Sequence, residues 1–144
     1  MDTRKVNYII AEASEKIASI EHDTVIVHLV MGEILGVQRQ DEPQRYYMLA
    51  RKVKSELERE YGIFLETVSK VGYRIVPKGN EINQCIGEAE SGIKKIYRAT
   101  AKTQYIRVDA IEDAEKRTKT IQIAQNMANM IGMLNAGQKR LITA

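Results

Sequence analysis

The side chains best suited to chemistry lie on one face of the segment 44–61. If this segment is a helix, each residue rotates by about 100°, and polar groups collect opposite an apolar stripe. They are cations, an amide, a hydroxyl and a thioether: Gln44, Met48, Arg51, Lys52, Ser55 and Arg59, with Tyr47 at the flank. Arginine contacts guanine, amides pair with adenine, and apolar atoms contact the methyl group of thymine. We therefore expect this face to bind double-stranded DNA, with the helix in the major groove.

The alternative for the same segment is a solvated helix that is neutralised by its own glutamates. Glu56, Glu58 and Glu60 support this interpretation because they would repel phosphate. They cluster in the last turns, however, and the N-terminal half of the helix is basic or neutral. Recognition helices usually meet base edges through their N-terminal residues, which favours DNA binding.

A second group of candidate residues lies in a predicted hairpin. Two short β-branched and aromatic runs, 64–68 and 73–76, flank a turn at 69–72 and indicate two strands. In such a hairpin, Lys70 and Arg74 would lie near a phosphate backbone, while Val68 and Tyr73 pack under the sheet.

The rest of the first half supplies the elements that position these residues. The apolar period predicts a helix, a β-branched run predicts a strand, and two further helices follow, ended by glycines and started by a proline. The expected elements are helix 6–20, strand 24–27, helix 28–35 ended by Gly36, a loop at 38–43, and helix 44–61 started by Pro43 and ended by Gly62. With the hairpin, the order becomes helix, strand, helix, helix, strand, strand. The winged helix is the most familiar small fold with this order.

The amino-acid sequence of the hairpin resembles that of a known family. Residues 65–76 are similar to the wing of OmpR/PhoB-type winged-helix effector domains, in which an apolar residue precedes Thr-Val-Arg-Gly-x-Gly-Tyr-Arg. The positions that match in register are Thr67, Val68, Gly72, Tyr73 and Arg74. The segment 50–58 resembles the basic recognition helix of that family, and similar wording occurs in small phage-encoded winged-helix proteins.

What the resemblance implies is a winged helix-turn-helix that binds DNA, over residues 24–78 and loosely over the first helix. Lys70 replaces the first glycine of the usual wing, so the turn must differ there or strain Lys70 toward a positive φ. The receiver domain and the N-terminal antiparallel sheet of the family have no counterpart, which argues against a phosphorylation-driven response regulator.

The last part of the chain predicts two helices joined as an antiparallel hairpin. Apolar residues recur at spacings of three and four in segment 82–100 and again in 110–134, as in a coiled-coil seam. The two seams are Ile82, Ile86, Ala89, Ile93, Ile96 and Thr100, and then Ala110, Ala114, Ile121, Ala124, Ala128 and Ile131. The hairpin could pack on the first part or on a second copy. Opposite the first seam, four cations extend the phosphate contacts or keep the hairpin soluble: Lys94, Lys95, Arg98 and Lys102.

Composition and charge narrow the class of protein. Of 144 residues, 44% are hydrophobic, too many for a disordered polyelectrolyte, and no apolar run reaches the length of a membrane span. Residues 45–78 hold 8 Lys/Arg against 4 Asp/Glu, whereas residues 1–44 hold 4 against 8, so the basic excess begins at the candidate helix. One cysteine and two histidines form no metal cluster, and neither Cys85 nor His28 has a catalytic partner; we expect packing roles for both.

Together these features predict an α+β, mostly α, chain: a winged helix-turn-helix over 1–78 and a C-terminal helical hairpin over 79–144. We expect a cytoplasmic, non-enzymatic homodimer without a cofactor that binds double-stranded DNA, as a transcriptional regulator of phage or mobile-element type. The candidate DNA contacts are Gln44, Tyr47, Met48, Arg51, Lys52, Ser55, Arg59, Lys70, Arg74, Lys95 and Arg98. The alternatives are a module that grips a partner protein through the C-terminal helices, and an accessory factor of DNA replication or packaging.

Overall fold

The computed structural model describes residues 2–143, with side chains up to residue 140. The chain divides into two compact units, Met1–Ile82 (unit 1) and Asn83–Ala144 (unit 2). Helices dominate both units, and unit 1 adds a small three-stranded antiparallel sheet. The expectation of an α+β, mostly α, fold is therefore confirmed.

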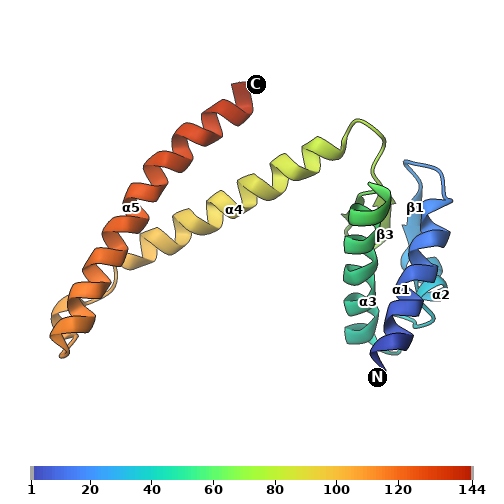
Figure 1. Cartoon of the computed structure of the whole chain (residues 1–144), viewed down its shortest axis with the longest axis horizontal. Helices are drawn as coiled ribbons and strands as arrows, with labels where there is room; N and C mark the ends of the chain where they lie inside the picture. Colours follow the sequence, from blue (N-terminus) through green and yellow to red (C-terminus); the bar gives the residue numbers. More distant parts are fainter. Residues whose placement is uncertain (1, 144) are drawn as a thin grey trace. The chain divides into compact units, whose positions relative to one another are not determined.

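Unit 1 contains three helices and three strands (Figure 1). In chain order they are α1 (Thr3–Ala18), β1 (Val25–Val27), α2 (His28–Leu35), α3 (Pro43–Glu56), the π-helical turn η1 (Leu57–Tyr61), β2 (Leu65–Val68) and β3 (Gly72–Ile75). The order helix, strand, helix, helix, strand, strand is the one that the sequence predicts.

The signals at the helix ends act as expected. Asp2 caps α1, because its carboxylate accepts a hydrogen bond of 3.1 Å from the backbone N–H of Arg4. Gly36 ends α2 with a φ of 72°, and Gly62 ends the turn after α3 with a φ of 61°, both left-handed. Pro43 is the first residue of α3, where its missing N–H costs no hydrogen bond.

The sheet has the order β1-β3-β2, so the last strand of the hairpin lies in the middle. Both pairings are antiparallel, with Ile26 opposite Tyr73 and Thr67 opposite Tyr73. At Gly72 the backbone of β1 comes so close that a Cβ atom would lie 2.0 Å from the carbonyl oxygen of Ile26. Only glycine fits this contact. Lys70, in the turn, has a φ of 63°, so of the two alternatives left open by the missing glycine the structure has the strained, positive φ.

The core of unit 1 lies between the inner faces of the helices and one face of the sheet. From α3 it takes Tyr46, Leu49, Ala50 and Val53, with Leu57 in the turn that follows; α1, α2 and the strands add Ile10, Ala13, Ile17, Met31, Leu35, Ile26, Leu65, Tyr73 and Ile75. Val68 was expected to pack beside Tyr73 under the sheet. That expectation is wrong: Val68 follows Thr67 and therefore lies on the opposite, outer face, where it is half-buried.

The π-helical turn departs from the regular helix that the sequence predicts over 44–61. A regular helix through 44–61 would place Glu60 within the apolar stripe, close to the buried Leu57. In the structure Glu60 is exposed. The turn from Leu57 to Tyr61 winds more widely than an α-helix, so the residues after Leu57 are rotated out of the α-helical phase. The carboxylate of Glu60 thus reaches solvent instead of the core.

His28 begins α2 and is half-buried, as the sequence predicts for a structural histidine. Its Nδ1 atom lies 2.8 Å from the hydroxyl of Tyr46, and its ring meets those of Tyr46 and Tyr73 edge-on. Burial, and secondarily the charge of Arg39, lower the pKa of His28 below its ordinary value. The fold therefore favours the neutral ring.

This shift predicts a pH dependence of stability. Because the pKa of His28 is lower in the folded than in the unfolded chain, the stabilisation is complete above the unfolded value of about 6.5 and is lost as the pH falls below it. We expect urea unfolding to show a lower free energy of unfolding at pH of about 5.5 than at about 7.5, with a smaller difference in His28→Gln. An equal fall in both proteins would assign the pH dependence to other groups.

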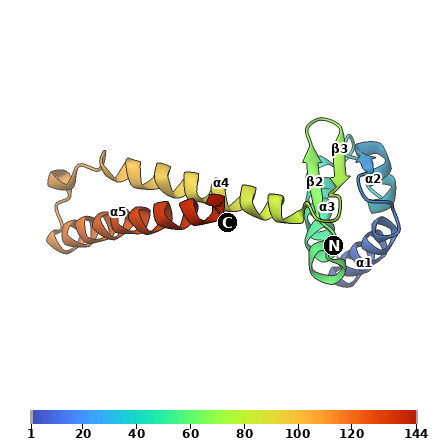
Figure 2. The ribbon, with the colours of Figure 1, turned by 90° about the horizontal axis from the view of Figure 1, so that it is seen from above.

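Unit 2 consists of two long helices, most of α4 (Glu81–Thr103) and α5 (Ala114–Thr143), joined by the short 3₁₀ turn η2 (Val108–Ala110). α5 runs back in the direction opposite to α4, as a hairpin requires, and the two helices diverge toward the end of α5 (Figures 1 and 2). It begins later and ends later than the predicted 110–134. No described helix combines the length and the apolar character needed to cross a membrane.

The seam of α5 differs from the predicted one. Its half-buried side chains recur at spacings of three and four: Arg117, Thr120, Ala124, Met127, Ile131, Leu134 and Gln138. This half-buried line is called the first seam of α5 below. Ala124 and Ile131 belong to it, as expected, but Ile121 and Ala128 are exposed, and Ala110 precedes the helix. The prediction failed because the apolar stripe of α5 is wide enough to contain more than one line at this spacing.

Candidate nucleic-acid interface

The face of α3 that points away from the core carries the predicted contacts. Leu49 and Val53 hold the helix against the sheet and α1, and each is fully buried. The predicted DNA contacts on this helix and its terminal turn are all exposed: Gln44, Tyr47, Met48, Arg51, Lys52, Ser55 and Arg59. The separation into a buried and an exposed side that the sequence predicts for them is therefore confirmed.

Part of this face forms one wall of a surface groove of about 490 Å³ between α3 and α1. From α3 and its terminal turn the lining residues are Arg51, Lys52, Ser55, Glu56 and Arg59; from α1 they are Asn7 and Ile10. The sequence did not identify Asn7, because it lies far from the basic segment and has no motif around it.

Two of the cations in the groove are not engaged by carboxylates. Among the side chains that the structure describes, neither Arg51 nor Lys52 takes part in an ion pair. Arg59 differs, because its guanidinium donates to Glu60 at 2.9 Å and also to Glu56. These hydrogen bonds and charges, with Glu60 the largest cause, raise the pKa of Arg59. Arg51 and Lys52 are therefore the groove cations best able to take up a new anionic partner.

The tip of the β2–β3 hairpin lies beside the turn between α2 and α3. Lys70 and Val71 of the hairpin line a hollow of about 330 Å³ together with Arg39 of the turn. The other lining residues are Asp41, Gln38, Gln40, His28, Val27 and Leu29. The structure thus adds Arg39 to the candidate cations. In the sequence, it is an isolated cation in a loop, which gave no signal.

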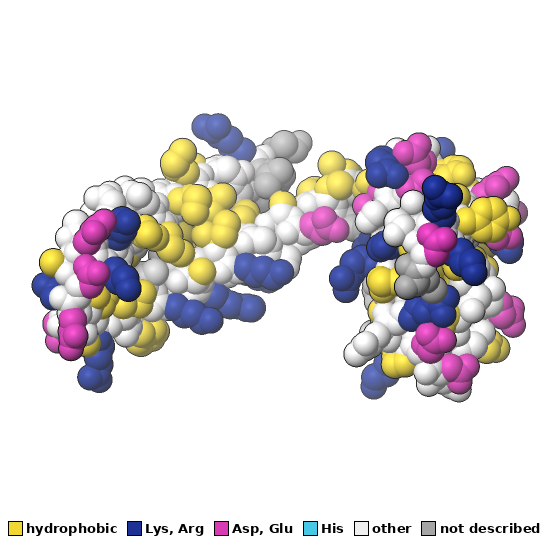
Figure 3. All heavy atoms as spheres, turned by 60° about the horizontal axis from the view of Figure 1, so that its bottom comes forward, with side chains coloured by type: hydrophobic (Ala, Val, Ile, Leu, Met, Phe, Trp, Pro, Cys, Tyr) yellow, Lys and Arg dark blue, Asp and Glu magenta, His cyan; other side chains and the backbone are white. Residues whose placement is uncertain are grey.

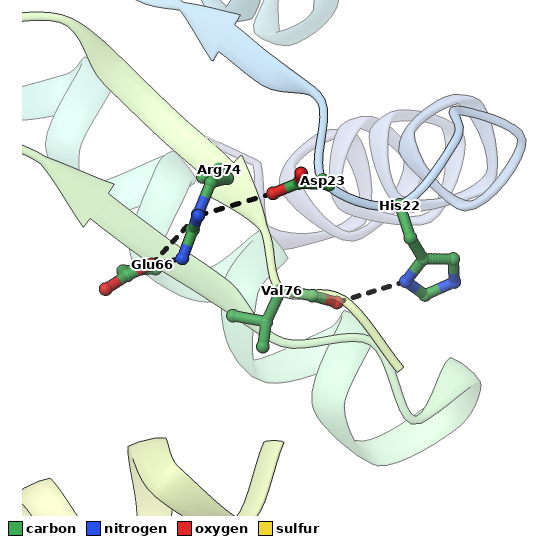
Figure 4. A network of polar contacts seen from close by, with 5 residues as sticks. All are labelled: His22, Asp23, Glu66, Arg74 and Val76. Carbon is green, nitrogen blue, oxygen red and sulfur yellow. Dashed lines mark hydrogen bonds and ion pairs between the residues drawn. The ribbon is translucent and has the colours of Figure 1, made fainter. Parts of the chain in front are cut away.

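Arg74 is placed differently from Lys70. It lies on the outer face of the sheet, where Nε and Nη2 donate to the carboxylate of Glu66 at 3.0 and 2.7 Å and Nη1 donates to Asp23 at 3.3 Å (Figure 4). Nearby, His22 Nδ1 lies 3.1 Å from the carbonyl oxygen of Val76. The guanidinium therefore joins β3 to β2 and to the segment before β1. The structure does not bring it together with the cations of α3.

Lys95 and Arg98 lie on α4 in unit 2, and both are exposed. They lie away from Ile93, the buried residue of this helix. On the face of the molecule drawn in Figure 3, apolar side chains gather over unit 2, while basic and acidic side chains are mixed over unit 1. Contact of Lys95 and Arg98 with DNA remains a prediction.

The described residues contain no group of three His, Cys, Asp or Glu side chains that could hold a metal ion. The packing role expected for Cys85 is wrong, because this cysteine is exposed on α4. Comparisons of the chain with models of protein families, with curated proteins and with solved structures give no match.

Proposed function

We propose that unit 1 is a winged helix-turn-helix domain that binds double-stranded DNA. The order of its elements supports this, as does the sheet order β1-β3-β2, in which β2 and β3 form the projecting hairpin, the wing. In this assignment α2 and α3 form the helix-turn-helix, and α3 is the recognition helix.

The dimensions of α3 suit the major groove. Its 14 residues extend over about 21 Å, and a groove about 12 Å wide accepts one α-helix. Gln44, Tyr47 and Met48 occupy the N-terminal half, where base edges are read. Arg51, Lys52 and Ser55 follow on the same exposed side and suit phosphates or guanine.

The observation that carries the proposal is the state of Arg51 and Lys52. Both are exposed on the outer face of α3 and without an ion pair among the described side chains. Arg59, by contrast, is already paired with Glu56 and Glu60. A row of cations left unpaired is available for phosphates, whose binding releases counterions from DNA.

Selection of random DNA duplexes on the purified full-length chain tests the proposal. We expect enrichment of a sequence motif, and an affinity for the selected duplex that falls linearly with the logarithm of salt concentration. No enrichment, together with no retention on immobilised duplex at low salt, would contradict it. A transcriptional regulator of phage or mobile-element type and a replication or packaging factor share this chemistry and differ only in the DNA site. The selected site would therefore also distinguish these two functions.

A second candidate function is a module that binds a partner protein, with unit 1 as a scaffold. The exposed apolar side chains of α5 favour it, since Ile123 and Met133 are 56% and 76% exposed. Capture of one specific protein by the full chain, without any binding to duplex DNA, would make it the better account.

The two cations of the wing predict different effects. The slope of log affinity against log salt is negative, and Lys70→Ala should reduce its magnitude by about 1. The reason is that the Lys70 side chain is exposed at the tip beside Arg39. Arg74→Ala should leave that slope unchanged and lower the free energy of unfolding by less than about 1 kcal/mol, since its ion pairs are solvent-exposed. Fluorescence anisotropy over a salt series measures the slopes, and urea unfolding measures the stability. A larger loss of slope in Arg74→Ala would show that DNA displaces its carboxylates.

A further inference from the structure

α5 carries a second line of residues at heptad spacing beside the first seam. This second seam consists of Lys119, Ile123, Asn126, Met130, Met133, Gly137 and Arg140, separated by four, three, four, three, four and three residues. All are exposed, and among its apolar members Ile123 is 56%, Met130 43% and Met133 76% exposed. The first seam is half-buried, whereas the second has no cover within unit 2.

A single copy of unit 2 buries too little to account for its own helices. Of its described side chains, only Ile93 on α4 is buried, and none on α5. Most of the stability of a helix in a protein comes from packing of its apolar face, and the 30 residues of α5 lack such packing on one seam. Further apolar surface must therefore cover α5.

The charge pattern of α5 indicates what covers it. Residues 120–138 contain no charged side chain, although the helix has charges before and after this stretch. Around a two-fold axis each residue meets the same residue of the other copy or its neighbours, so a charge near the axis would face a like charge. An uncharged middle suits contact with an identical helix, while a charged partner would leave it without complementary groups.

We infer that a second copy of this chain covers the second seam of α5. The two α5 helices run antiparallel with the two-fold axis near residues 126–130, and the two hairpins form a four-helix bundle. In this arrangement Lys139 and Arg140 of one copy lie level with a segment of mixed charge in the other, which holds Asp113 and Glu115 but also Lys116, Arg117 and Lys119. A parallel pair would instead bring Lys139 and Arg140 of both copies to the same end, where they repel.

Asn126 supports a defined register. It is the one uncharged polar side chain in the second seam, and its Oδ1 accepts a hydrogen bond of 3.1 Å from Gln122. A polar residue at a single seam position specifies register and number of chains at a cost in stability. The inference rests on unit 2 alone, so it is independent of whether unit 1 binds DNA.

Light scattering after size-exclusion chromatography of the full chain tests the inference. We expect twice the mass of one chain for the wild type, and the mass of one chain for Ile123→Lys with Met130→Lys. The matched control, Gln125→Lys with Ala136→Lys, adds the same charge on the other side of α5 and should keep the double mass. A wild type with the mass of one chain, or seam variants that keep the double mass, would overturn the inference.

Spin labels test the orientation without disturbing the apolar side chains. In a Cys85→Ser chain, a label at Asn129→Cys lies beside the axis and should give a short distance between copies. A label at Arg140→Cys lies about 12 residues from the axis in each copy, so its two copies should be about 36 Å apart. Short distances at both positions would indicate a parallel pair and contradict the proposed arrangement.

Discussion

Replacing Arg51 and Lys52 together by alanine is expected to weaken binding to duplex DNA by about 2–3 kcal/mol, which corresponds to roughly 30- to 160-fold in affinity. The physical reason is that both cations lie in the groove beside α1 without an ion pair among the described side chains, so each can neutralise a phosphate or contact guanine. The magnitude of the negative slope of log affinity against log salt should decrease by about 2, because each removed cation leaves one phosphate with its counterion. Anisotropy titrations with a selected duplex at several salt concentrations measure both quantities.

Matched variants separate the groove from charge in general. Lys16→Ala with Lys78→Ala removes the same charge from positions that do not line the groove, and should cost much less affinity. Arg59→Ala should have an intermediate effect, because Glu56 and Glu60 already engage its guanidinium. An equal loss in the Lys16/Lys78 variant would indicate unspecific attraction, and an unchanged affinity of the Arg51/Lys52 variant would rule out the assigned face.

The largest effect on folding is expected for Gly72→Ala. The added Cβ would meet the carbonyl oxygen of Ile26 at 2.0 Å, and this neighbour is backbone, which cannot rotate away as a side chain can. Gly72 pairs with β1 on one side and with β2 on the other, so relief of the contact must separate strands of the sheet. We expect a loss of about 3 kcal/mol or more in the free energy of unfolding, at the upper end of the cost of overpacking.

Gly36→Ala provides the comparison for Gly72→Ala. Its Cβ would meet no atom within 4 Å, so only the left-handed backbone is strained, at a cost of about 1–2 kcal/mol. Near-ultraviolet circular dichroism follows the unfolding of unit 1 through its buried Tyr46 and Tyr73. If Gly72→Ala were no less stable than Gly36→Ala, the close approach of β1 to β3 would be excluded.

Local signals were sufficient to predict the elements of unit 1. Gly36, Pro43 and Gly62 each act through the conformation of one residue, and the structure places all three where the sequence does. The exposed face of α3 was equally accessible, because helical periodicity alone separates Arg51 and Ser55 from Leu49 and Val53. These features depend on residues within one or two turns of each other.

Features that depend on distant residues could not be predicted. The carboxylate of Asp23, which engages Arg74, is 51 residues away in sequence, so nothing near Arg74 announced the ion pair. The π-helical turn has no residue pattern of its own, and it moved Glu60 out of the apolar stripe. In α5 several lines of apolar residues share the same spacing, so the spacing alone does not decide which line is partly buried.

The brevity of the sheet affects how copies of this chain can aggregate. β1 and β2 are its edge strands, with 3 and 4 residues. Edges this short offer a poor template for a strand from another molecule, and Glu66 places a charge on one of them. Growth of an intermolecular β-ladder from unit 1 is thereby disfavoured even at high local concentration.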